Sequence, residues 1–351
     1  MKALCISAPG QASVTDLALP AIGPQEVLIR SHAVGICGSD VELYRGTRPE
    51  GFYRYPVIPG HEWSGEIVEV GDAVRTLVPG QKVVVEGILS CGSCENCRMG
   101  LTNLCEAGYD EIGFTRPGGL AEYVAVPARQ VHVLPDNASL EEAALLEPAA
   151  VVAHAFLRVS PQAGCSVAVI GDGTIGQLAV QMARLFSPAE ILVLGSRENR
   201  LELARQLGAT RTVNLGYEDP LPVARALSRG RGMDLVFEGG SRSSGVKLAL
   251  DLARRGGTVL LEGIAGAAAQ LNLESDVFVL KHLSVQGIFG AHTAAWTYTV
   301  QLFRSGCLNL APLITHRFAL SDYQTALNVL ADRQGHTLKV LLLHQLGERN
   351  I

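Results

Sequence analysis

The segment from residue 165 to residue 208 constrains the fold of this chain more than any other. CSVAVIGDGTIGQLAVQMARLF contains an apolar strand, a glycine-rich turn and an amphipathic helix, and EILVLGS and ENRLELARQLGA then repeat strand and helix as far as Gly208. Strand signals continue in GMDLVFEGG, GGTVLLEGI and LSVQGIFG. Because strands alternate with helices here, the sequence predicts a parallel, doubly wound sheet.

The glycine-rich turn has the spacing G-x-G-x-x-G, with its glycines at Gly171, Gly173 and Gly176. The first glycine permits a tight turn, the second lets the backbone approach a pyrophosphate, and the third lets the helix pack closely on the strand. The start of the helix then offers N–H donors to the phosphates. We therefore expect these glycines, with Thr174 and Ile175, to bind a dinucleotide; the alternative is a plain glycine turn.

The first 150 residues have a different pattern. Short β-branched runs such as EVLIRSHAVGI, EWSGEIVEVG and GQKVVVEGI are broken by Gly and Pro, which predicts a strand-rich, barrel-like domain. SLEEAALLEPAAVVAHAFLRV, from residue 139, predicts a capped helix that Pro148 either kinks or restarts. A chain of 351 residues exceeds the roughly 250 to 300 at which single cores stop growing, so we expect two domains. The tail from about residue 289, which ends in the strand TLKVLLL, should return to the first domain.

Four of the eight cysteines fall in CGSCENCRMGLTNLC, with the spacing C-x2-C-x2-C-x7-C. Thiolates at Cys91, Cys94, Cys97 and Cys105 can surround one tetrahedral zinc with no position left open, which is typical of a structural site. A redox-active C-x-x-C pair and ordinary loop thiols are the alternatives. The cluster predicts a zinc lobe over about residues 88–108.

Composition excludes several classes of protein. The chain is 48% hydrophobic and 18% charged, and has neither an apolar signal core at its start nor an uncharged apolar run of about 18 residues. We therefore expect a cytoplasmic protein without a membrane partner. A net charge of −5 with no dense basic run argues against binding to nucleic acid.

Several motifs together resemble those of the zinc-dependent medium-chain alcohol dehydrogenases. GICGSD (35–40), PGHEWSGEIVEVG (59–71), the four-cysteine lobe, LEPAAVVAH and the glycine turn follow in that family's order, along essentially the whole chain. The resemblance implies an α/β protein with a GroES-like catalytic domain formed by residues 1–152 and 289–351. A Rossmann domain at residues 153–288 would bind the dinucleotide, the active site would lie in the cleft between them, and the protein would form a homodimer or homotetramer.

The same resemblance assigns a second zinc, which is catalytic. By position, Cys37, His61 and Glu147 would bind it, and the carboxylate ligand is typical of the polyol and threonine dehydrogenase branch. Glu62 would alternate with water or substrate as a ligand, and Asp40 would orient the ligating histidine. Each chain would then hold two zincs.

Zinc of this kind polarises a substrate oxygen while hydride passes between the substrate carbon and a nicotinamide. Ser39 matches the family's proton relay, but a histidine common three residues later is replaced by Glu42, so either Glu42 takes over or the proton leaves another way. YPVIPGHEWSG and GFTRPGGLAEY resemble segments of aminocyclitol dehydrogenases, which implies a polyol, sugar alcohol or aminocyclitol as substrate. The alternatives are a zinc-free quinone or enoyl reductase and a nucleotide-sensing or structural protein without turnover.

The segment ILVLGSRENR bears on the cofactor. Enzymes selective for NAD usually place Asp or Glu at the end of the second strand, where this chain has Gly195. Ser196, Arg197 and Arg200 could instead bind the 2′-phosphate of NADP. The alternative is that both arginines are solvated at a helix start, where positive charge is unfavourable unless an anion is present. We expect NADP to be preferred and NAD to be possible.

Overall fold

A computed structural model describes residues 1–240, 242–266, 269–332 and 336–344 of the chain. The chain divides into two units, one formed by Met1–Ala150 with Ala291–Ile351 and the other by Val151–Gly290. Each boundary lies two residues from the one predicted from the sequence. The fold class is α/β, as predicted, with one unit built on a seven-stranded sheet and the other on a six-stranded parallel sheet.

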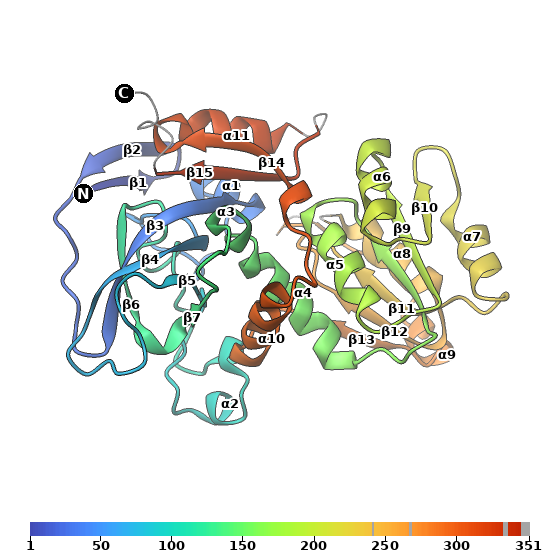
Figure 1. Ribbon diagram of the computed structural model, residues 1–351. Coiled ribbons are helices and arrows are strands. Elements are labelled where there is room, and N and C mark those ends of the chain that lie inside the picture. The colour runs from blue at the N-terminus through green and yellow to red at the C-terminus, as the bar shows by residue number, and fades with distance from the viewer. Residues whose placement is uncertain (241, 267–268, 333–335, 345–351) are drawn as a thin grey trace. The chain divides into compact units, whose positions relative to one another are not determined.

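The first unit is built on a seven-stranded sheet of order β14-β15-β3-β4-β5-β7, in which β6 also pairs with β3. Its strands are β3 (Glu26–Ile36), β4 (Glu62–Val70), β5 (Lys82–Val85), β6 (Tyr123–Pro127), β7 (Val131–Val133), β14 (Ile314–Ala319) and β15 (Lys339–Leu343), and a separate hairpin joins β1 (Lys2–Ala8) to β2 (Gln11–Asp16). The predicted return of the tail is confirmed, because β15 pairs antiparallel with β3 (Figure 1). Ile29, Trp63 and Val83 are among the buried side chains that form its core.

The helical elements of this unit are short. They are α1 (Gly38–Arg45), α2 (Glu95–Arg98), α3 (Leu140–Ala143), α10 (Thr293–Arg304), α11 (Tyr323–Ala331) and the 3₁₀ turns η1 (Thr102–Leu104), η2 (Ala128–Gln130), η3 (Ala311–Leu313) and η4 (Leu320–Asp322). Ser139 caps α3, since its hydroxyl accepts the N–H of Glu142 at 3.3 Å. A separate helix, α4 (Leu146–Val159), then begins, so Pro148 lies in the first turn of a new helix.

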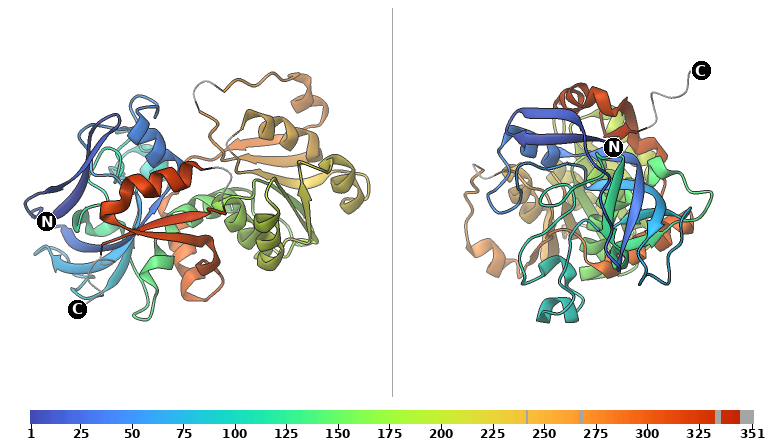
Figure 2. Two further views of the ribbon diagram at one scale, coloured as in Figure 1. Left: turned by 90° about the horizontal axis from the view of Figure 1, so that it is seen from above. Right: turned by 90° about the vertical axis from the view of Figure 1, so that its left-hand side faces the viewer.

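The second unit contains a six-stranded parallel sheet of order β10-β9-β8-β11-β12-β13. Its strands are β8 (Ser166–Ile170), β9 (Glu190–Gly195), β10 (Arg211–Asn214), β11 (Met233–Glu238), β12 (Ala253–Leu261) and β13 (Ser284–Gly287), and its helices are α5 (Thr174–Arg184), α6 (Glu198–Leu207), α7 (Pro220–Leu227), α8 (Ser243–Leu252) and α9 (Asp276–Leu280). The strand order reverses between β8 and β11, and helices lie on both faces of the sheet (Figure 2). The predicted doubly wound sheet is confirmed, but β10 and α7 were not foreseen.

Candidate active site and metal centres

The pairing of β3 with β4 brings the first two predicted zinc ligands together. Gly35 lies opposite Glu62 in this pair, so Cys37 just after β3 meets His61 just before β4. The sulfur of Cys37 lies 3.3 Å from Nε2 of His61. Cys37, His61 and Glu62 can each place one ligand atom within 4.8 Å of the others. Thiolate, imidazole and carboxylate are ligands that zinc prefers, so this donor set fits zinc.

Asp40 contacts both halves of this group. Its Oδ2 accepts the N–H of Cys37 at 3.0 Å, and its Oδ1 lies 3.7 Å from Nδ1 of His61. A carboxylate this close favours a proton on Nδ1 and so leaves the Nε2 lone pair on the side of Cys37, where a metal would bind. The hydroxyl of Ser39 lies 2.6 Å from the Cys37 sulfur, and Glu42 follows three residues later on α1, half-buried.

The electrostatics of the site favour a cation. Burial alone would lower the pKa of His61, but the Cys37 thiolate and the Asp40 carboxylate raise that pKa well above its usual value. Glu147, on the first turn of α4, lies outside the group that meets within 4.8 Å, yet the charges of His61 and Glu62 affect it. Burial, with the nearby carboxylates, raises the pKa of Glu147 to about 8. Raised pKa values at His61 and Glu147 mean that these groups tend to hold protons, and a bound metal would displace such protons from its ligands.

Lys339 is a site residue that sequence reasoning missed. Its Nζ lies 2.7 Å and 2.5 Å from the two oxygens of Glu62, and both side chains are almost completely buried. Lys339 starts β15, whose next residue pairs with the last residue of β3, and this register sets the lysine beside the metal ligands. The only sign of this residue in the sequence is that a lysine begins the apolar run KVLLL.

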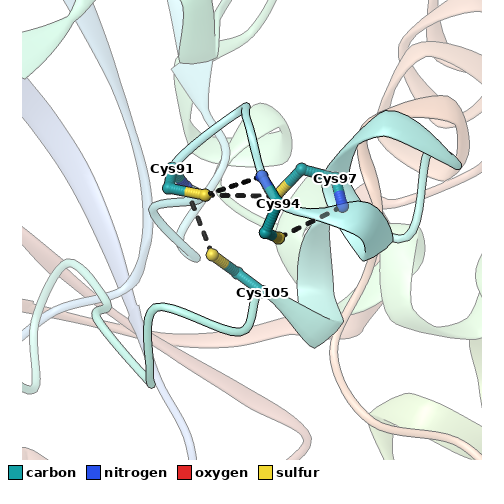
Figure 3. A group of neighbouring side chains, drawn as sticks. All are labelled: Cys91, Cys94, Cys97 and Cys105. Carbon is teal, nitrogen blue, oxygen red and sulfur yellow. Dashed lines mark hydrogen bonds between the residues drawn. The ribbon is translucent and has the colours of Figure 1, made fainter.

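The four cysteines of the lobe converge on one point (Figure 3). Their sulfur atoms lie within 4.8 Å of one another, and backbone N–H groups donate to sulfur atoms of the cluster, including those of Cys91, Cys94 and Cys105. N–H and O–H groups of Ser93 are the main cause that lowers the pKa of Cys91 to about 5, whereas burial and the neighbouring thiols raise that of Cys97 to about 11. All eight cysteines are free thiols. One tetrahedral zinc satisfies all four donors and leaves no open position, so the site fits a structural zinc.

The glycine turn of the second unit has the geometry that its spacing predicts. Gly171 adopts φ 118°, a conformation that side chains disfavour. A Cβ added at Gly176 would lie 1.9 Å from the carbonyl oxygen of Gly171, so the helix can approach the strand only with glycine there. A Cβ added at Gly173 would meet no atom within 4 Å. The second glycine therefore faces open space at the start of α5, where Thr174 and Ile175 form the first turn.

The arginines after β9 are half-buried and lie near a carboxylate. The side chains of Arg197 and Arg200 are only 24% and 11% exposed. Their Nη1 atoms lie 3.6 Å and 3.4 Å from Oδ1 of Asp172, the residue between the first two glycines of the turn. The anion that the helix start requires therefore comes from the chain itself, and sequence reasoning did not foresee it.

Comparison with known proteins identifies the family. Residues 23–136 match the alcohol dehydrogenase GroES-like domain, and residues 174–305 match the zinc-binding dehydrogenase family. The chain is 36% identical to an L-threonine 3-dehydrogenase of Legionella pneumophila over 329 residues, 93% of this chain and 95% of that protein.

Solved structures agree with this assignment. Galactitol-1-phosphate dehydrogenase of Escherichia coli is 31% identical with a TM-score of 0.88, over 98% of this chain and all of that one. A Sinorhizobium meliloti protein, described as a zinc-binding dehydrogenase and bound to NADP, is 31% identical with a TM-score of 0.90, over 97% and 98% of the two chains.

The chain therefore belongs to the zinc-dependent medium-chain dehydrogenase family, in its threonine and polyol dehydrogenase branch. Within that family it is a zinc-containing, NAD(P)-dependent dehydrogenase that acts on a small-molecule alcohol.

Proposed function

We propose that this enzyme interconverts a secondary alcohol and its ketone, and that the substrate is a polyol, sugar alcohol or aminocyclitol. The observation that carries the proposal is the meeting of Cys37, His61 and Glu62, with Glu147 in electrostatic reach. Zinc at such a site supplies Lewis acidity, and a nicotinamide supplies or accepts the hydride.

We assign the following roles to the chain's own side chains. Cys37, His61 and Glu147 would hold the metal, and Glu62 would alternate with water or substrate as a ligand. Asp40, whose Oδ1 lies 3.7 Å from Nδ1 of His61, would orient the histidine. The Ser39 hydroxyl, 2.6 Å from the Cys37 sulfur, takes the proton of the substrate hydroxyl as it passes its own proton on. Glu42, three residues later on α1, is one acceptor for the proton that Ser39 releases, and another exit route is the alternative.

A substrate panel tests the proposed class. It contains polyols, cyclitols, aminocyclitols, galactitol 1-phosphate, L-threonine and primary alcohols, each followed by the change in nicotinamide absorbance. L-Threonine is the second candidate substrate, because relatives of this chain at about 35% identity are L-threonine 3-dehydrogenases, and L-threonine is a secondary alcohol. The highest kcat/KM should belong to a secondary alcohol, and preference for a primary aliphatic alcohol would refute the proposal.

We propose that NADP is preferred over NAD. Gly195 puts no acidic side chain of its own at the end of β9, Ser196 offers a hydroxyl, and the guanidinium groups of Arg197 and Arg200 lie close by. The S. meliloti relative bound to NADP supports this proposal. Arg197→Ala should lower kcat/KM for NADP by roughly tenfold to a hundredfold and change that for NAD much less. A wild type that favours NAD would contradict it.

We also propose a homodimer or homotetramer. In the second unit β13 is an edge strand of the sheet, and the nearby residues Val279 and Leu280 are 80% and 68% exposed. Exposed apolar side chains beside an unpaired strand edge are typical of an interaction surface. Light scattering after gel filtration measures the subunit number, and a monomer at micromolar concentration would contradict this proposal.

In the described part of the chain no helix is long and apolar enough to cross a membrane. We propose a cytoplasmic location, where the eight free thiols stay reduced.

A further inference from the structure

The acid that is missing from the end of β9 is replaced by an acid from the glycine turn. A Cβ added at Gly195 would lie 2.6 Å from both Cβ and Oδ2 of Asp172. The Asp172 side chain thus fills the space that a side chain at position 195 would need. Glycine at position 195 is therefore a steric requirement of Asp172.

Asp172 also occupies the groups that make this turn attractive to an anion. Its Oδ2 accepts the backbone N–H groups of Ser196 at 2.7 Å and Arg197 at 2.9 Å. Its Oδ1 lies 3.6 Å from Nη1 of Arg197 and 3.4 Å from Nη1 of Arg200, and Asp172 is only 6% exposed. Backbone N–H donors with arginine forks are the usual partners of a phosphate. In this chain they already hold a carboxylate.

We propose that Asp172 determines how strongly the enzyme discriminates between NADP and NAD. The inference rests on the proposed dehydrogenase function and deepens it. In dinucleotide-binding folds, the acid at the end of the second strand accepts hydrogen bonds from the ribose hydroxyls, and Asp172 brings a carboxylate to that same strand end. It offers an acceptor to a free ribose diol and a like charge to a 2′-phosphate. The carboxylate of Asp172 offsets part of the positive charge of Arg197 and Arg200 that a 2′-phosphate would meet, so Asp172 limits the preference for NADP.

The variant Asp172→Asn tests this proposal. It keeps the size of the side chain and an oxygen that can accept backbone N–H bonds, but it removes the charge. Titration of NADPH and NADH fluorescence, without alcohol and at fixed salt, gives the two dissociation constants. The ratio of Kd for NADH to Kd for NADPH should rise about tenfold, which corresponds to about 1.4 kcal/mol. An unchanged ratio would overturn the proposal.

A matched control is present in the same unit. Asp234, near the start of β11, also accepts a backbone N–H, from Ser166 at 2.8 Å, and also pairs with an arginine, Arg254 at 2.5 Å. It lies at the amino end of the parallel strands, whereas Asp172 lies at their carboxyl end. Asp234→Asn should lower thermal stability without changing the Kd ratio. The same change of ratio in both variants would reduce the role of Asp172 to general stability and overturn the proposal.

A second pair of variants tests the shared space. Gly195→Asp alone should lower the melting temperature, because its Cβ meets Asp172, and the double variant Asp172→Gly with Gly195→Asp should restore stability and bind NADH more tightly than NADPH. A Gly195→Asp protein as stable as wild type would contradict the steric argument. Wild-type protein that binds neither nucleotide would refute the proposed function together with this inference, whereas normal wild-type binding with an unaltered ratio in Asp172→Asn would refute the inference alone.

Discussion

Lys339→Met should destabilise the first unit more than any change of a surface charge. The substitution removes the cation that pairs with both oxygens of Glu62 and leaves this carboxylate buried. Burial by itself lowers the pKa of Lys339, but the charges of Glu62 and Cys37 outweigh it and raise that pKa above its usual value, so Lys339 is charged at neutral pH. Removing one partner of a buried ion pair costs about 3–5 kcal/mol. For a unit of this size, the loss corresponds to a fall in melting temperature of about 6–20 °C.

Scanning calorimetry at neutral pH measures this loss against a matched control. Arg317 on β14 pairs with Glu141 at 2.6 Å, in the same unit, but its side chain is 45% exposed. An exposed pair contributes at most about 1 kcal/mol, so Arg317→Met should lower the melting temperature by only a few degrees.

A double variant separates the ion pair from packing. Lys339→Met with Glu62→Gln leaves no buried charge, so it should recover most of the stability lost in the single variant. The reasoning is refuted if Lys339→Met is as stable as Arg317→Met, or if the double variant is no more stable than Lys339→Met alone.

Three further predictions concern the metals, the pH dependence and the glycine turn. Cys94→Ser should reduce zinc from two to one per chain and lower thermal stability, while Cys37→Ser should abolish turnover with little loss of stability; elemental analysis and melting curves check this, and equal destabilisation would contradict it. Burial raises the pKa of Glu238 to about 7 from its ordinary 4.5, so its contribution to stability is fully present below about pH 4.5 and is lost as the pH rises through 7. Glu238→Gln should therefore flatten the dependence of melting temperature on pH across this window, and it should raise the melting temperature at pH 8. An unchanged pH profile would count against this prediction. Gly173→Ala should fold normally but bind NADPH at least about tenfold more weakly, because its methyl group enters the space expected for the pyrophosphate, whereas Gly176→Ala should lose both stability and binding through its clash; thermal melts and fluorescence titration distinguish the two, and full NADPH affinity in Gly173→Ala would disprove the assignment of that space.

Local features of the site could be predicted because their geometry depends on near neighbours along the chain. The four cysteines fall within fifteen consecutive positions and the three glycines within six. Spacing alone therefore indicates that the cysteines can surround a metal and that the glycines can form a phosphate-binding turn. The alternation of strands with helices likewise indicated the parallel sheet, and the end of α6 at Gly208 followed from a residue that adopts a positive φ. The resemblance to a known family added Cys37 and His61, whose motifs are short and distinctive.

Other features depended on strand register and on burial, which no local pattern contains. Lys339 is 277 positions from Glu62 in the sequence, and their charges meet because β15 and β4 both pair with β3. The contacts of Asp172 arise in the same way, because the turn after β8 lies beside the end of the adjacent strand β9. The sequence by itself determined which groups could bind zinc and a dinucleotide. The tertiary structure decided which charges these groups meet, since a buried charge must find its partner among whichever segments the fold places next to it.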